Sequence, residues 1–193
     1  MDKQELQEAR TNPEFLDYLE TTRINAIAAK DIAALYEVLD SMLILDLDEE
    51  KINSVYQTIL ETSFEKVEVI VNNNQKLSLD DEKLYYVRAL YEHGIEKWSY
   101  DNFDGAKDLL FVLSNIVEDE TLADALQVHI IALVNNITLD DFYEKEVNLN
   151  ACNSEEKYGY FITSFNNDVK ALLEDNSELL KKEFENLKHL LDA

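Results

Sequence analysis

The sequence predicts an all-α fold, an array or bundle of about eight antiparallel helices built from helical hairpins. Apolar residues recur at steps of three and four along most of the chain, which is the spacing of one face of an α-helix. The 193 residues include three glycines and one proline, too few for the many tight turns of a sheet-rich protein. Hydrophobic residues make up 46% of the chain, enough for a core. The length suits one domain, 1–193, which the polar run at 72–75 would subdivide into 1–75 and 76–193.

The first part of the chain contains four predicted helices. Asn12 and Pro13 mark the clearest start, because asparagine caps a helix and proline at the first helical position loses no hydrogen bond. Asp31 caps the next helix, and the run Asp46–Asp48 begins a long one. The four helices span residues 2–10, 13–28, 31–45 and 46–71.

Residues 78–117 form the centre of the predicted fold, two helices joined by a short turn. Ser78 and Asp81 have the spacing of a capping box at the start of the first helix. Asn102 or Asp101 caps the second helix. The two helices span residues 78–98 and 103–117. A connection this short makes them antiparallel neighbours.

Small and aromatic residues in this central hairpin carry a resemblance. Gly94, Phe103 and Ala106 have the spacing of the glycine, the aromatic residue and the alanine of a tetratricopeptide (TPR) repeat. Residues 90–106 therefore resemble the helix–turn–helix of that repeat and are similar to the small TPR chaperones of type III secretion systems, over about one repeat. A large apolar residue, a tyrosine and a proline of the repeat are replaced here by His93, Lys97 and Glu118.

The resemblance implies a partner-binding surface on the first central helix. Family members hold extended peptides on the concave side of the repeat, and that side corresponds here to Arg88, Tyr91, Ile95 and Trp98. The alternative is that the three apolar members of this set are core residues, since a stripe at helical spacing is the ordinary sign of packing.

Four further helices are predicted after the central hairpin. They span residues 119–135, 138–147, 154–173 and 177–191. Thr138 and Asp141 repeat the capping-box spacing, and the stretch 148–153 is the most irregular. The last helix carries a short heptad-like seam: Leu180, Phe184, Leu187 and Leu191. This seam would pack on the body of the protein or on a second copy, which makes a homodimer through the C-terminal helix one expectation. No convincing strand is present.

The net charge of −24, from 41 acidic and 17 basic residues spread along the chain, limits the classes of partner. Direct binding to nucleic-acid phosphate needs clustered lysine and arginine, so it is excluded, and anionic membrane surfaces are disfavoured. A basic protein partner would be attracted, although the charge also serves solubility alone. The chain begins without an apolar signal segment and has no run of about 18 apolar residues, so the expected location is the cytoplasm.

Signatures of catalytic, metal and cofactor sites are missing from the sequence. One cysteine and three scattered histidines do not supply the four ligands of structural zinc, and no glycine-rich phosphate loop occurs. Cys152 is expected to be unreactive, and His129, on the apolar face of its helix, is expected to be a satisfied core histidine. We therefore expect no catalytic residues, no metal and no cofactor.

These observations favour a non-enzymatic protein–protein interaction module, a scaffold or chaperone-like protein that binds a protein or peptide segment in a helical groove lined by Arg88, Tyr91, Ile95 and Trp98. The alternative is an acidic mimic of nucleic acid that inhibits a DNA-binding protein with rows of carboxylates. The two functions differ in salt dependence, because charge-driven binding weakens as salt rises and apolar burial does not. An enzyme is a third alternative, which requires a pocket that joins a histidine to carboxylates.

Overall fold

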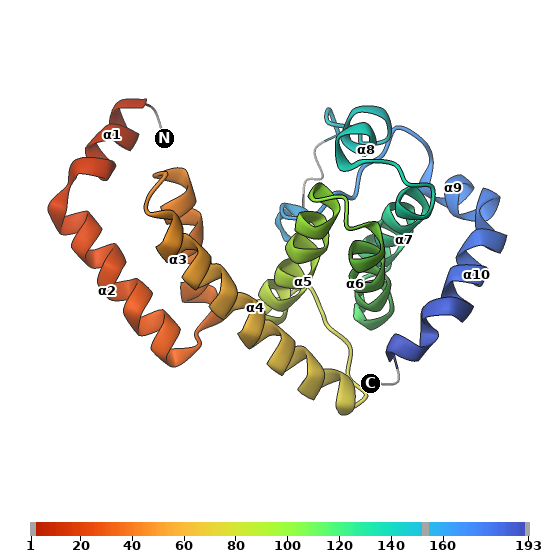
Figure 1. The fold of residues 1–193 in the computed structure, drawn as a ribbon, viewed down its shortest axis with the longest axis horizontal. Helices are drawn as coiled ribbons and strands as arrows, with labels where there is room; N and C mark the ends of the chain where they lie inside the picture. The colour runs from red at the N-terminus through yellow and green to blue at the C-terminus, as the bar shows by residue number, and fades with distance from the viewer. Residues whose placement is uncertain (1–2, 152–154, 192–193) are drawn as a thin grey trace. The chain divides into compact units, whose positions relative to one another are not determined.

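The protein is all-α in a computed structural model that describes residues 3–151 and 155–191. Within those ranges the chain forms ten α-helices, two 3₁₀ turns and no strand. Two isolated bridges join Leu77 to Val117 and Val147 to Phe165. The all-α prediction is confirmed. The described residues form more helices than the predicted count of about eight, although the ranges expected for the individual helices, including the short ones at 2–10 and 138–147, already numbered ten (Figure 1).

The helices follow one another along the chain with short connections. Their bounds are α1 Lys3–Thr11, α2 Pro13–Ala29, α3 Ile32–Ile44, α4 Glu49–Asn72, α5 Asp81–Ser99, α6 Phe103–Ile116, α7 Glu120–Val134, α8 Leu139–Lys145, α9 Val169–Asp175 and α10 Ser177–Leu187. The 3₁₀ turns span Glu156–Tyr158 and Lys188–Leu191. Contacts within the chain divide it into two units, Met1–Lys66 and Val67–Ala193, and the division falls inside α4. The polar run at 72–75 is the end of α4, where Asn74 adopts a positive φ of 55°.

The first unit is built on the packing of α2 against α3. The predicted cap at Asn12 is confirmed, since its side-chain oxygen accepts hydrogen bonds from the backbone N–H groups of Glu14 and Phe15. The predicted cap at Asp31 is confirmed in the same way by the N–H of Ala34. Lys30, in the left-handed region at φ 50°, ends α2 and separates it from α3.

The second unit is organised by α5, α6 and α7, which pack side by side (Figure 1). The predicted cap at Asn102 is confirmed, because its side-chain oxygen accepts the N–H of Gly105 at 3.1 Å. The backbones of α5 and α6 approach closely at Gly94, where an added Cβ would lie 2.7 Å from Cδ2 of Leu110. Ala106 of α6 is fully buried. The small residues Gly94 and Ala106 therefore permit the close approach of α5 and α6.

The prediction that Ser78 caps α5 is wrong. The helix begins three residues later, at Asp81, and Asp80 occupies the cap position without a side-chain cap bond. The hydroxyl of Ser78 donates instead to the carboxylate of Asp80. Leu77 explains the delay, because its backbone pairs with Ile116 and Glu118 at the end of α6 and holds this stretch outside the helix.

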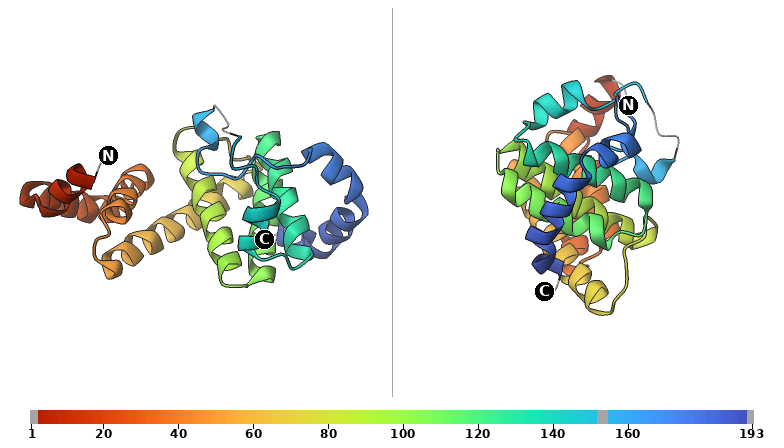
Figure 2. Two further views of the ribbon diagram at one scale, coloured as in Figure 1. Left: turned by 90° about the horizontal axis from the view of Figure 1, so that it is seen from above. Right: turned by 90° about the vertical axis from the view of Figure 1, so that its right-hand side faces the viewer.

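The prediction of one helix over residues 154–173 is also wrong. After the 3₁₀ turn the chain runs without helix through residues 159–168, named here the crossing segment, and α9 begins at Val169. Asp168 restarts the helix as a cap that accepts the N–H of Ala171 at 3.0 Å. Figure 2 shows the crossing segment passing the α5–α7 helices on its way to α9. Phe161 and Phe165 suggested a helix, but residues four apart also share one face of an extended chain.

Candidate partner-binding site

The crossing segment lies against α5 and α7 at the residues that the sequence suggested for a partner. Tyr91 of α5 accepts a hydrogen bond at its Oη from the backbone N–H of Ile162, at 3.1 Å. The ring of Phe161 packs edge-on against the ring of Tyr91, with centroids 5.2 Å apart. The Phe165 ring meets the imidazole of His129, on α7, in the same manner at 5.9 Å. We call the surface made by Arg88, Tyr91 and His129 the α5–α7 face.

A chain of hydrogen bonds runs from the crossing segment through this face. Nδ1 of His129 lies 2.7 Å from the carbonyl oxygen of Ala125, which accepts only, so Nδ1 carries a proton. In the neutral imidazole Nε2 is then the acceptor, and the hydroxyl of Tyr91 donates to it at 3.2 Å. Tyr91 thus donates to α7 and accepts from Ile162, which fixes its hydroxyl between the two.

Burial keeps both groups of this pair uncharged. Desolvation lowers the pKa of His129 to about 4, against the weaker opposing influence of its bond to Ala125. Desolvation also raises the pKa of the Tyr91 phenol well above its ordinary value. His129 is fully buried and both of its ring nitrogens are hydrogen-bonded, which confirms the prediction of a satisfied core histidine.

Arg88 extends the face towards the outer side of the crossing segment. Its guanidinium lies over the ring of Tyr160 at 4.1 Å from the centroid, a cation–π contact. Its Nε donates to the Glu92 carboxylate at 2.7 Å. The side chain of Arg88 is buried, whereas the ring of Tyr160 that lies over it remains 39% exposed.

Trp98 and Ile95 complete the set suggested by the sequence, and they differ in environment. Trp98 is fully buried, with Nε1 donating to the carbonyl oxygen of Ile137 at 2.9 Å and its ring 4.9 Å from that of Phe142. It therefore packs towards α8 as a core residue. Ile95 is half-buried. The structure thus brings Arg88 and Tyr91 to the crossing segment and places Trp98 behind them.

A clamp that the sequence did not indicate holds the start of the crossing segment. Asp119, the cap of α7, accepts from Lys157 Nζ at 2.9 Å and from Tyr158 Oη at 3.0 Å. Burial alone would raise the pKa of Asp119. The hydrogen bonds from Lys157, the Leu122 N–H and Tyr158 outweigh that effect and hold the pKa below its ordinary value, so the carboxyl is charged. The cluster of aromatic residues at 158–165 was the one feature of the sequence that could have indicated a packed segment here. We predicted a helix over residues 154–173 instead, so these contacts were missed.

The C-terminal helix packs on the body of its own unit. Leu187 of α10 is buried, and Phe184 packs against Phe111 of α6 with ring centroids 5.9 Å apart. A cavity of about 370 Å³ lies along this contact and is lined by residues of α6, α7, α9 and α10. Phe184 remains 43% exposed. The homodimer through this helix stays a prediction.

Other classes of site have few candidates among the described residues. Across residues 3–151 and 155–191, no three His, Cys, Asp or Glu side chains gather closely enough to hold a metal ion. None of the described helices is long and apolar enough to cross a membrane. Cys152, considered as a nucleophile, lies outside the described residues.

Comparisons of the chain with protein-family models, with curated proteins and with solved structures found no match. The TPR-like resemblance of residues 90–106 therefore stays a prediction.

Proposed function

We propose that the chain is a non-enzymatic protein–protein interaction module that binds a segment of a partner protein in a helical groove at the α5–α7 face, as a scaffold or chaperone-like protein of the cytoplasm. The observation that carries the proposal is the seating of a non-helical segment on this face, through the Tyr91 hydrogen bond and two aromatic contacts. A surface that holds one such segment has the donors, acceptors and ring contacts to hold another.

The arrangement of the central helices gives further support. A three-residue connection, 100–102, joins α5 to α6, and the close approach at Gly94 is the packing that a TPR-like hairpin requires. In the proposal α5 and α6 form that antiparallel hairpin. Arg88, Tyr91 and Ile95 of α5 then contribute to the binding surface, with Trp98 supporting it from behind.

The alternative function, an acidic mimic of nucleic acid, is favoured by the charge alone. Acidic residues outnumber basic ones by 15 to 6 in the first unit and by 26 to 11 in the second. The charge is thus shared by both units, and long-range attraction of a basic partner would involve the whole chain.

Photo-cross-linking tests the proposed site. A benzophenone amino acid at position 95, which is half-buried on α5, is expected to cross-link to the partner captured from the native cell, identified by mass spectrometry. The matched control is the same probe at Tyr100, the C-cap of α5, which is 79% exposed and lies nine positions beyond Tyr91. Cross-links from position 100 but not from 95, with both proteins folded by circular dichroism, would refute the proposed site.

Salt dependence separates the two functions in the same capture experiment. Binding at the α5–α7 face depends on aromatic burial, so we expect most of the captured partner to remain as salt rises. A mimic of nucleic acid would lose its partner steeply over that range, because exposed charges are screened.

A further inference from the structure

The crossing segment contributes two aromatic side chains to the second unit from a backbone that forms no helix. Phe161 and Phe165 are each more than nine-tenths buried. Phe161 contacts the ring of Tyr91, and Phe165 contacts the rings of His129 and Phe142. The two rings lie four positions apart and both contact the α5–α7 face.

The backbone of the crossing segment makes hydrogen bonds of its own, in addition to the ring contacts of its side chains. Ile162 N–H donates to the hydroxyl of Tyr91, whereas Asn166 N–H and the carbonyl of Ser164 pair with Glu146 and Asn148 at the end of α8. The outer side of the segment borders a cavity of about 360 Å³ that reaches Tyr143 of α8. The segment is therefore packed on one side and open on the other, and such regions open at lower free energy than packed helices.

The composition of the segment differs from that of the chain around it. Its last residue, Asp168, caps α9, and the other residues, 159–167, carry no charged side chain, although 30% of the chain is charged and the net charge is −24. An acidic occupant would be repelled by this protein, so the acceptable occupants are uncharged or basic.

We propose that the crossing segment is an intramolecular stand-in for the partner, and that the partner segment displaces it. This inference rests on the proposed function and specifies its ligand. The partner carries a non-helical, uncharged or basic segment with two aromatic side chains four residues apart. These rings take the places of Phe161 and Phe165, and a backbone N–H of the partner replaces that of Ile162 at the Tyr91 hydroxyl.

The clamp at Asp119 sets how firmly the stand-in is held. Lys157 and Tyr158 lie just before the segment and bind Asp119 from outside the α5–α7 face. A linked occupant competes at an effective concentration on the order of millimolar. Loosening the clamp therefore lowers the occupancy of the stand-in and leaves the seat for the two rings intact.

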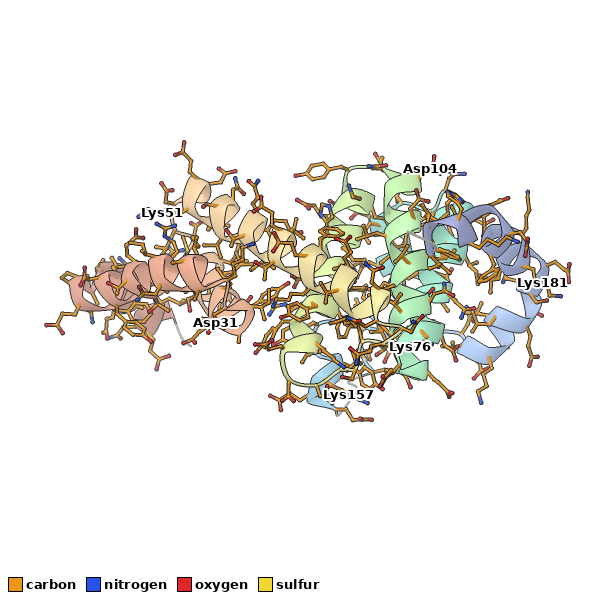
Figure 3. The ribbon with its side chains drawn as sticks, turned by 90° about the horizontal axis from the view of Figure 1, so that it is seen from below. Asp31, Lys51, Lys76, Asp104, Lys157 and Lys181 are labelled. Atoms are coloured by element: carbon orange, nitrogen blue, oxygen red, sulfur yellow. The ribbon has the colours of Figure 1, made fainter. Side chains whose placement is uncertain are left out.

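The test uses the full chain and a labelled synthetic peptide with the sequence of residues 159–167, which carries no charged side chain. The peptide is expected to bind the Tyr158→Phe and Lys157→Met variants at least tenfold more tightly than the unchanged protein, measured by fluorescence anisotropy. The matched control is Lys181→Met, which removes an exposed lysine paired with Glu178, well separated from Lys157 (Figure 3). This control is expected to bind as the unchanged protein does.

A second variant tests the seat itself. Phe165→Ala empties one ring site, and the peptide is expected to raise the thermal midpoint of this variant, or to induce its folding. The same peptide with alanine at both aromatic positions, 161 and 165, is expected to have no effect.

The outcomes separate the two proposals. Equal peptide affinity for the unchanged protein and the clamp variants would overturn displacement and leave the proposed function standing. Failure of the peptide both to bind the clamp variants and to rescue Phe165→Ala would overturn the inference. If the Ile162 amide also exchanges rapidly with solvent in those variants, an open face that binds nothing refutes the proposed function as well.

Discussion

The buried pair of His129 and Tyr91 makes the stability of the protein depend on pH in a defined direction. Burial lowers the pKa of His129 from its ordinary 6.5 to about 4 in the folded protein. Between these values the unfolded chain binds a proton that the folded chain does not. The contribution of His129 to stability is therefore complete above pH 6.5 and is lost as the pH falls from 6.5 to 4.

The magnitude follows from the shift. Each pKa unit corresponds to about 1.4 kcal/mol, so the complete loss below pH 4 is about 3 kcal/mol, and about 2 kcal/mol is lost between pH 7 and pH 4.5. Protonation at Nε2 also removes the acceptor for the Tyr91 hydroxyl, which couples the loss to the seat of the crossing segment.

The assay compares urea unfolding of the protein and of His129→Gln, followed by circular dichroism at pH 7 and at pH 4.5. Glutamine keeps one donor and one acceptor and does not titrate, whereas the many carboxylates titrate in both proteins and cancel in the difference. We expect the unchanged protein to lose about 2 kcal/mol more than the variant. The same pH dependence in both proteins, or an NMR titration of His129 near 6.5, would refute the reasoning.

Two further substitutions test the packing of α5. Gly94→Ala would place a Cβ 2.7 Å from the buried Leu110 side chain. The overpacking cost of about 1–3 kcal/mol exceeds the gain of about 1 kcal/mol in helix propensity, so we expect urea unfolding to show a less stable protein. A more stable variant would mean that α5 and α6 separate easily and would contradict the close packing. Trp98→Phe leaves the Ile137 carbonyl without its indole donor, and we expect the free energy of unfolding to fall by about 1–3 kcal/mol in the same measurement. A loss of less than about 0.5 kcal/mol would mean that water replaces the donor.

Local signals were sufficient where the helix ends are set by a nearby side chain. Asn12, Asp31 and Asn102 each cap the helix that follows, because the bond runs from a side chain to an N–H two or three residues on. Ser78 had the same sequence pattern and failed, because the backbone of Leu77 pairs with residues forty positions away. A contact at that separation leaves no trace in the local pattern.

In the candidate site, too, the local features were predictable from the sequence and the long-range contacts were not. The spacing of Tyr91 and Trp98 placed both on one apolar stripe of α5, which the structure bears out, but a stripe does not say what covers it. In the fold Trp98 meets Ile137 and Phe142, whereas Tyr91 meets the crossing segment.

The sequence by itself determined the all-α class and most of the helices, since hydrophobic period and caps act over one or two turns. Only the tertiary structure decided that residues 159–168 leave the helix. Two aromatic residues four positions apart are compatible with a helix and with an extended chain. The non-helical backbone is the one in which Phe161 contacts α5 and Phe165 contacts α7, and these contacts involve residues far away in the sequence.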